Sequence, residues 1–258
     1  MVTGASAGLG REFAMQLARK GYDLVLVARD GARLHTLANE LKSFGASSEV
    51  IPADLTVDDE VSRVVARIDH AAPDVLVNNA GFGTRRSFVR ESREQQEAMI
   101  RVHVLAANRL AHAAVHGMVA RHSGAIINVS SIASWMTSPG NVNYSATKAW
   151  QRSFIESLSL ELRGTGVYVQ ALCPGYVHTE FHARGAMDMS HTPSWMWMKA
   201  DVVVAASLAA LERRRPVVVV PGIGYKVIAL TLRFMPKWCW QLLLGTVRGS
   251  RKPGGPGQ

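Results

Sequence analysis

The stretch that decides the fold is Thr3-Gly4-Ala5-Ser6-Ala7-Gly8-Leu9-Gly10, a glycine-rich turn near the start of the sequence. Apolar residues at helical spacing follow it over residues 11–18, and a strand-like run follows at residues 22–28. Glycines let the backbone approach a phosphate group, and the start of a helix favours its negative charge. The turn therefore predicts a pyrophosphate site, although glycines at positions 4, 8 and 10 leave a plain strand–helix turn as an alternative.

Strand and helix patterns alternate along the remaining sequence. Further strands are predicted at residues 49–52, 74–78, 125–129, 167–172 and 217–220. Helices are predicted at residues 31–44, 57–70, 93–121 and 144–164. Valine-rich strands separated by helices are typical of a parallel sheet covered on both faces, so the sequence predicts a doubly wound, Rossmann-like α/β fold.

The first strand of this sheet is expected to be truncated. Only Met1 and Val2 precede Thr3, whereas a strand takes roughly five residues. Three explanations stay open: the strand is simply short, the sequence is a fragment, or it uses a late start codon. Because the first strand lies in the middle of a doubly wound sheet, we expect unpaired backbone and a cavity beside it.

The composition is that of an ordinary globular protein, with 48% apolar and 19% charged residues. The formal net charge of +9 would suit an anionic membrane, nucleic acid or a phosphorylated small molecule, and a solvated basic surface is the plainer alternative. We expect no nucleic-acid partner, because no helix-turn-helix, zinc or RNA-binding pattern accompanies the charge. Cys173 and Cys239 lack CxxC or histidine-rich surroundings, so we predict no metal site and a reducing, cytoplasmic location.

A second informative stretch runs from Ile126 to Lys148. Its strand pattern ends near Ser131, and Tyr144 and Lys148 are four residues apart on one face of a helix. An isolated tyrosine titrates near pH ~10, and a nearby ammonium favours the tyrosinate and brings that pKa toward neutrality. With a serine hydroxyl that binds the same oxygen, these residues can exchange a proton with a carbonyl or an alcohol.

The end of the second predicted strand indicates which dinucleotide binds. A carboxylate there would accept hydrogen bonds from the ribose of NAD, but this chain has Ala28 followed by Arg29. A guanidinium at this place favours a 2′-phosphate, and hence NADP(H) over NAD(H). Asp30 weakens this interpretation slightly, and an ordinary surface arginine is the alternative.

Together these features resemble the short-chain dehydrogenase/reductase family, in its single-domain branch, over nearly the whole sequence. The motifs that carry the resemblance are Thr3-Gly4-x-x-x-Gly8-x-Gly10, Asp54, Asn78-Asn79-Ala80-Gly81, Ser131, Tyr144-x-x-x-Lys148 and Pro174-Gly175-x-Val177-x-Thr179. The resemblance implies a sheet of seven parallel strands, a nicotinamide cofactor, and hydride transfer between that cofactor and a carbonyl/alcohol pair.

The resemblance also implies a role for individual residues. Tyr144 is implied to be the acid–base group, Lys148 to lower its pKa and hold the ribose, and Ser131 to orient the substrate carbonyl. Asp54 is implied to contact adenine, and Thr179 the nicotinamide carboxamide. The residues implied to bind the cofactor are Thr3, Gly4, Ser6, Gly8, Leu9, Gly10, Arg29, Asp54, Leu55, Asn79, Ala80, Gly81, Tyr144, Lys148, Pro174, Gly175, Val177 and Thr179.

One position departs from the family pattern. The family has an asparagine in a context such as Val-Asn-Val, whereas this chain has Val102-His103-Val104. The family's asparagine supports a water molecule that is linked to the lysine in a proton relay. His103 could hold that water, relay protons itself or have a structural role, and we include it among the catalytic candidates. Asn108 is a poor substitute, because five residues turn it about 140° around a helix.

Two segments are rich in apolar side chains. In residues 180–199, methionine and tryptophan suggest a lid over a hydrophobic substrate, and packing against the domain or a second subunit is the alternative. Residues 223–247 contain Lys226, Arg233 and Pro236, so no run reaches the ~18–20 apolar residues that cross a bilayer. Docking on a membrane surface, packing over the substrate cleft and a dimer interface all stay open for this segment.

We therefore expect one catalytic domain over residues 1–222, which includes the lid, then an apolar and basic helical extension over 223–247 and a flexible basic tail over 248–258. The leading hypothesis is an NAD(P)(H)-dependent oxidoreductase that acts on a small carbonyl or alcohol substrate of hydrophobic character. The alternative is a non-catalytic nucleotide-binding scaffold or sensor. Family habit implies a homodimer or homotetramer through the helices at 93–121 and 144–164.

Overall fold

The computed structural model describes residues 1–83, 87–137, 140, 142–180 and 193–235. Within these residues, seven parallel strands form one sheet in the order β3-β2-β1-β4-β5-β6-β9. The strands are β1 (Val2–Thr3), β2 (Leu24–Ala28), β3 (Ser48–Pro52), β4 (Val75–Asn78), β5 (Gly124–Val129), β6 (Val167–Leu172) and β9 (Val218–Val219). The chain reverses its direction across the sheet between β1 and β4, which confirms the predicted doubly wound fold.

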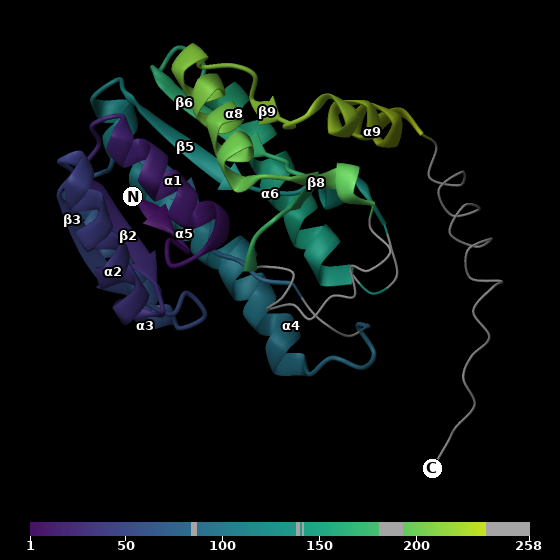
Figure 1. Cartoon of the computed structure of the whole chain (residues 1–258), viewed down its shortest axis with the longest axis horizontal. Coiled ribbons are helices and arrows are strands. Elements are labelled where there is room, and N and C mark those ends of the chain that lie inside the picture. The colour runs from purple at the N-terminus through teal and green to yellow at the C-terminus, as the bar shows by residue number, and fades with distance from the viewer. Residues whose placement is uncertain (84–86, 138–139, 141, 181–192, 236–258) are drawn as a thin grey trace.

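Helices cover both faces of the sheet (Figure 1). One face is covered by α1 (Gly8–Arg19), α2 (Gly31–Leu41) and α8 (Ala200–Arg213). The other is covered by α3 (Asp58–His70), α5 (Ala107–Ala120) and α6 (Val142–Glu161). Neighbouring residues of a strand point to opposite faces, so Leu26 packs in the first core while Val27 packs in the second. Both cores therefore draw on the same continuous apolar strands.

The predicted helix at residues 93–121 is continuous but not uniform. It consists of α4 (Arg93–Ile100), a π-helical turn at Arg101–Ala106, and then α5. π-Helical turns are rare and are found most often at functional sites. The position that departs from the family pattern, His103, lies in this turn and is fully buried.

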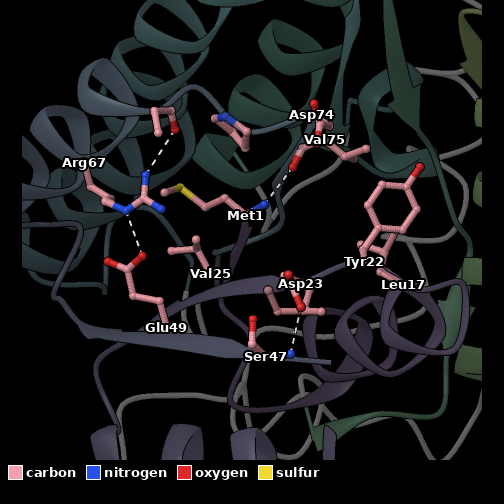
Figure 2. Close-up of a pocket in the computed structure, with 13 residues that line it drawn as sticks. Met1, Leu17, Tyr22, Asp23, Val25, Ser47, Glu49, Arg67, Asp74 and Val75 are labelled. Carbon is pink, nitrogen blue, oxygen red and sulfur yellow. Dashed lines mark hydrogen bonds and ion pairs between the residues drawn. The ribbon is translucent and has the colours of Figure 1, made fainter. Parts of the chain in front are cut away.

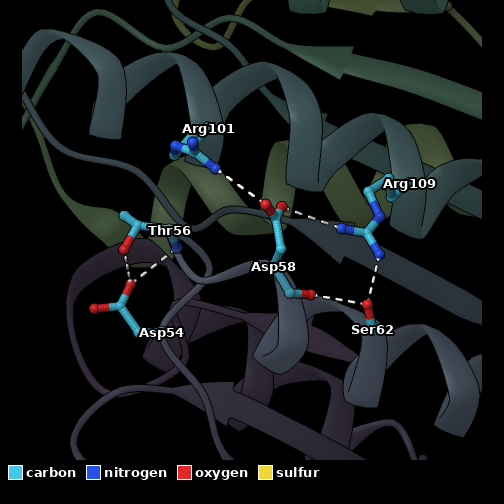
Figure 3. A network of polar contacts seen from close by, with 6 residues as sticks. All are labelled: Asp54, Thr56, Asp58, Ser62, Arg101 and Arg109. Carbon is cyan, nitrogen blue, oxygen red and sulfur yellow. Dashed lines mark hydrogen bonds and ion pairs between the residues drawn. The ribbon is translucent and has the colours of Figure 1, made fainter.

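A polar network fixes the π-helical turn against α3 (Figure 3). The Asp58 carboxylate, at the start of α3, lies 3.2 Å from Arg101 and 3.4 Å from Arg109. Arg109 also donates to the Ser62 hydroxyl at 2.7 Å. Both arginines come from the long helix, so this network joins that helix to the start of α3.

The first strand is short, as expected. Val2 of β1 pairs with Leu26 of β2 and Val77 of β4, so two residues hold the middle of the sheet. A cavity of about 250 Å³ lies directly before them, lined by the starts of β2, β3 and β4 (Figure 2). The Met1 amine is buried against this cavity and donates to the Val75 carbonyl oxygen at 2.7 Å.

The carboxyl-terminal segments are described only in part. Tyr176–Val177 (β7) and Trp197–Met198 (β8) form a small parallel sheet of their own at the base of the expected lid. Helix α9 (Ile223–Phe234) begins the expected extension and projects beyond β9 (Figure 1). Residues 181–192 of the lid and 236–258 of the extension and tail lie outside the described residues. The boundaries assigned from the sequence therefore stay predictions.

Candidate active site

The predicted site residues lie at one edge of the sheet. Gly4 follows β1, Asn79 follows β4, Ser131 follows β5 and Pro174 follows β6. In a parallel sheet the carboxyl ends of the strands share one edge, and here β1 and β4 are the neighbours at which the chain reverses. The fold thus gathers the glycine turn and the acid–base residues at the crevice where doubly wound proteins bind ligands.

The glycine turn has the shape of a phosphate cradle. Gly4 and Gly8 have φ angles of +65° and +55°, and a Cβ atom on Gly10 would overlap the Gly4 carbonyl oxygen. Helix α1 begins at Gly8 with neither a side-chain cap nor an acidic residue in its first turn. The first N–H groups of α1 thus have no capping side chain or acidic residue from the helix start itself, which suits the binding of an anion. These features fit the pyrophosphate of a dinucleotide.

Thr3, Asn79 and Ala80 brace the turn from behind. The Thr3 hydroxyl accepts hydrogen bonds from the backbone N–H groups of Asn79 and Ala80, both at 3.0 Å. The Asn79 side chain donates to the carbonyl oxygens of Thr3 and Gly4 at 2.9 and 3.3 Å. The side chain of Asn79 is thereby engaged in shaping the turn.

Arg29 and Asp54, which are predicted to bind the adenosine part of the cofactor, lie close together after β2 and β3. Arg29 is 72% exposed at the end of β2, and its guanidinium lies 3.9 Å from the Asp54 carboxylate. The other Asp54 oxygen accepts from the N–H and hydroxyl of Thr56 at 2.9 and 2.8 Å (Figure 3). Leu55 is buried in the second core, together with residues of α3.

Ser131 and Tyr144 come together as predicted. Ser131 begins a short 3₁₀ helix after β5, and its hydroxyl accepts from the Ala133 N–H at 3.1 Å. A hydrogen bond with Ser131 lowers the pKa of Tyr144, but burial of the phenol dominates and raises it to about 12. The expected shift toward neutrality is therefore not what this arrangement gives, because desolvation of a tyrosinate outweighs the hydrogen bond.

Lys148 is buried one helical turn after Tyr144. Its ammonium lies 5.8 Å from the centre of the Tyr144 ring. It donates to the Val129 carbonyl oxygen at 2.7 Å and to the Gln151 side-chain oxygen at 3.0 Å. Burial lowers the pKa of Lys148 from 10.5 to about 7, so the charge that should act on Tyr144 is itself only marginally stable at neutral pH.

The ring of His103 is fixed on both sides. Its Nε2 accepts from the Phe82 N–H at 3.0 Å, which makes Nδ1 the protonated nitrogen, and Nδ1 then donates to the Thr147 hydroxyl at 2.9 Å. Burial and nearby Lys148 lower the pKa of His103 well below its usual value. A Cβ atom on Gly81 would lie 2.6 Å from Nε2, so glycine makes room for the imidazole. Of the three roles left open, a structural one agrees best with a neutral and fully bonded ring.

The segment Pro174–Thr179 approaches the glycine turn from the other side. A Cβ atom on Gly8 would lie 3.3 Å from that of Thr179, so the glycine turn and this segment are in contact. The Tyr225 ring of α9 covers Gly175, and its hydroxyl accepts from the Tyr176 N–H at 3.0 Å and donates to the Met196 carbonyl at 2.7 Å. Val177 is buried in the core. Helix α9 is thus anchored beside the crevice.

Sequence reasoning missed two residues that belong to this neighbourhood. Gln151 contacts Lys148, and spacing could have indicated it, because positions 148 and 151 are neighbours on a helix surface. Arg33 lies beside the exposed Arg29 region, pairing with Asp30 at 3.4 Å and with Glu180 at 3.0 Å. No local pattern indicated the contact with Glu180, which joins positions 147 residues apart. Among the described residues, no group of three or more metal-ligating side chains occurs.

Comparisons with known proteins agree with this geometry. The short chain dehydrogenase family model matches residues 1–189. The 3-oxoacyl-[acyl-carrier-protein] reductase FabG of Staphylococcus aureus is 33% identical over 69% of this chain and 73% of its own length. Inactive hydroxysteroid dehydrogenase-like protein 1 of Homo sapiens is 28% identical over 93% of this chain and 73% of its own length.

Among solved structures, a short-chain dehydrogenase from Sphingobium yanoikuyae in complex with NADPH matches with a TM-score of 0.82. It is 33% identical, and the match covers 99% of this chain and 97% of that chain. The fold, the residues gathered at the switch point and the family model lead to one conclusion. The chain belongs to the short-chain dehydrogenase family of oxidoreductases.

Proposed function

We propose that this protein reduces the carbonyl group of a hydrophobic substrate with NADPH, or oxidises the corresponding alcohol with NADP. The observation that carries this proposal is the convergence of Ser131, Tyr144 and Lys148 beside a glycine turn at the switch point of the sheet. The bound cofactor supplies or accepts the hydride. Ser131 binds the substrate oxygen, Tyr144 exchanges a proton with it, and Lys148 holds a positive charge close to the phenol and a ribose hydroxyl.

Several features support a hydrophobic substrate and the reducing direction. Trp197 stacks on His178 at 4.9 Å between ring centres and lies 5.7 Å from Tyr176, which places aromatic rings at the base of the lid. The raised pKa of Tyr144 keeps the phenol protonated at neutral pH, as a proton donor must be. The relative from Staphylococcus aureus is named for reduction of a 3-oxoacyl group, which is one candidate class.

The deciding experiment follows NADPH oxidation by its near-UV absorbance, against bulky ketones, steroid ketones and 3-oxoacyl thioesters, with the matching alcohols and NADP in reverse. Turnover of a hydrophobic ketone would support the proposal. Tight NADPH binding without turnover in either direction would favour the alternative of a nucleotide-binding scaffold. That alternative gains some support from the human relative named as inactive.

The preference for NADP(H) rests on charge at the end of β2. The Asp30 carboxylate, which would oppose it, caps helix α2 by accepting from the Arg33 N–H at 3.0 Å. The exposed Arg29 guanidinium is then the charge that a 2′-phosphate would meet.

Replacing Arg29 by Ala should raise the KM for NADPH by about 10- to 100-fold, since one charge-assisted contact is lost, and leave the KM for NADH within about 2-fold. Initial rates over a range of both cofactors measure this. Arg213→Ala is the matched control, because Arg213 is an exposed arginine at the end of α8 and contacts none of the site residues. Equal effects of Arg29→Ala on both cofactors would contradict the preference.

Peripheral membrane contact is a second part of the proposal. No helix within the described residues is long and apolar enough to cross a membrane. Helix α9 nevertheless exposes Ile223, Val227, Leu230 and Phe234 along one face, with Tyr225 and Ala229 buried on the other. The exposed face is flanked by Lys226 and Arg233 and carries no acidic residue, which suits an anionic lipid surface. A cytoplasmic location and self-association through α5 and α6 stay predictions.

Replacing Ile223, Val227 and Leu230 together by Ser should reduce co-sedimentation with phosphatidylserine-containing vesicles at least about 5-fold, because apolar burial drives interfacial binding. Val202→Ser on α8, also an exposed apolar residue, is the control. Unchanged sedimentation would refute membrane docking by this face. A change from dimer to monomer instead would show that the face joins two copies of the chain.

A further inference from the structure

The Gln151 side chain links Lys148 to the long helix. Its oxygen accepts from the Lys148 ammonium at 3.0 Å, and its amide nitrogen donates to the His103 carbonyl oxygen at 2.9 Å. Gln151, His103 and Lys148 are all buried, with exposures of 1%, 0% and 4%. The bridge therefore joins α6 to the π-helical turn inside the protein.

The chemistry of this bridge suits a primary amide. Gln151 must accept from an ammonium on one side and donate to a carbonyl on the other, and an amide does both at once. A carboxylate could only accept, and its charge would oppose the His103 carbonyl oxygen. An alcohol or an asparagine at this position would be too short to span both partners.

Hydrogen bonds also hold the side chain of His103 in place. Phe82 and Thr147 hold the ring on opposite sides, and Thr147 in turn donates to the Tyr144 carbonyl oxygen at 3.1 Å. Displacing this turn would move both the acceptor of Gln151 and the start of the Tyr144 helix. The bridge is thus part of a connected set of hydrogen bonds around the acid–base pair.

The positive charge of Lys148 is stabilised by uncharged oxygen acceptors. Within the described part of the chain, no carboxylate forms an ion pair with it, and its ammonium is held by the Val129 carbonyl and the Gln151 amide. A buried ammonium is stable only where oxygen atoms replace its water. The Val129 acceptor belongs to the backbone, whereas the Gln151 acceptor belongs to a side chain. A substitution can therefore remove only the Gln151 acceptor.

We propose that Gln151 is a positioning residue for the acid–base pair, which holds Lys148 as an ammonium beside Tyr144 by tying it to the His103 carbonyl. This inference rests on the proposed function, because it assumes that the charge on Lys148 assists proton transfer by Tyr144.

The titratable groups that act on Lys148 or Tyr144 lie on several elements. Tyr144 lies on the same helix as Lys148, His103 lies on the π-helical turn, Cys173 directly follows β6, and Tyr176, which acts on Tyr144, lies on β7. Burial lowers the pKa of Lys148 to about 7, and burial raises those of Tyr144 to about 12 and Cys173 to about 11. Lys148 is thus the group of this cluster that a lost acceptor would convert to its neutral form near pH 7.

The test compares Gln151→Met with Gln151→Glu in ketone reduction. In a plot of the reduction rate against pH, the fall at high pH (the high-pH limb) reports the first proton lost from the coupled Tyr144–Lys148 pair. Met has similar volume but accepts no such bond. The ammonium is then less stabilised, its pKa falls, and the limb should move down by about one pH unit. Glu adds a negative charge, so the limb should move up by at least about one unit. Turnover of Gln151→Met should fall about 10-fold, with the KM for NADPH within about 3-fold.

The control is Gln170→Met, another buried glutamine. Gln170 lies in β6 and bonds to Tyr168 and Ser207, apart from the acid–base residues. The Gln170→Met variant should lose thermal stability, but the limbs of its pH–rate profile should lie at the same pH values as in the parent. A merely structural role for Gln151 would likewise leave the limbs in place, whereas opposite shifts for Met and Glu require an effect on charge.

A second readout does not depend on turnover. The ε-carbon signal of Lys148 in ¹³C-lysine-labelled protein, identified by its loss in Lys148→Arg, should titrate at lower pH in Gln151→Met and at higher pH in Gln151→Glu. Identical limbs and identical titrations in parent and variants would overturn the inference. If the parent protein shows no ketone reduction, the proposed function is contradicted but this inference is not. The titration of the Lys148 ε-carbon signal would then decide the inference. If Gln151→Met does not fold, Gln151→Glu decides it by the same criteria.

Discussion

Replacing Tyr144 by Phe should lower kcat for ketone reduction by about 10³-fold, since general acid catalysis by a positioned side chain contributes on this order. The phenol is bonded with Ser131, and its ring packs at 6.0 Å from His103. Phenylalanine keeps the ring and removes only the hydroxyl. The NADPH affinity, measured by fluorescence titration, should therefore stay within about 3-fold of the parent.

Tyr22→Phe is the control for this substitution. Tyr22 also loses a phenol hydroxyl, but it lines the cavity at the opposite edge of the sheet. Its kcat should remain close to that of the parent. If Tyr144→Phe kept more than about a tenth of the parental kcat, Tyr144 would not be the proton donor, and the proposed assignment of the site would be wrong.

A protein that begins at Met1 should lose stability as the pH falls from about 8 to about 5. Burial lowers the pKa of the Met1 amine from 8.0 to about 5, with Asp74 raising it and Arg67 lowering it further. Between these values the unfolded chain binds a proton that the folded chain excludes, so stability rises with pH across this window and is flat below it. The total difference is on the order of 4 kcal/mol.

An amino-terminal extension of five alternating Val and Thr residues should remove this pH dependence and raise the Tm by about 10 °C at pH 6. The extension turns the buried amine into an amide. It also continues β1 between β2 and β4 and fills the cavity of about 250 Å³ (Figure 2). Thermal unfolding at several pH values, followed by circular dichroism, measures both effects.

A Gly-Ser extension of equal length separates the two causes. It also converts the amine to an amide, so the pH dependence should vanish, but it packs no side chains and should raise the Tm much less. Identical unfolding of all three proteins between pH 5 and 8 would show that the two residues of β1 are sufficient.

The sequence was enough for the architecture, because the signals for it are local. The apolar run at residues 22–28 became β2, and the run at 74–78 became β4, with shifts of one or two residues. A doubly wound sheet brings the carboxyl ends of its strands to one edge, so the glycine turn and Ser131 could be placed together before any contact was known. Tyr144 and Lys148 could be paired because they are one helical turn apart.

Other features depended on contacts between distant parts of the chain. The sequence left three roles open for His103. Burial in the folded chain lowers the pKa of its ring, and Phe82 and Thr147, 21 and 44 residues away, bond to its two nitrogens. Gln151 faces the His103 carbonyl across 48 residues, through a π-helical turn that the periodicity of the long helix did not reveal.

The pKa values of Tyr144 and Lys148 show most clearly what the sequence determined and what the fold decided. Residue identity and spacing predicted that Lys148 lowers the pKa of Tyr144, whereas burial in the folded chain raises that pKa to about 12 and lowers that of Lys148 to about 7. Sequence alone determined that Tyr144 and Lys148 would lie one helical turn apart, because helix periodicity is a local property of the chain. Only the tertiary structure decided their protonation, because desolvation depends on every element that packs around them.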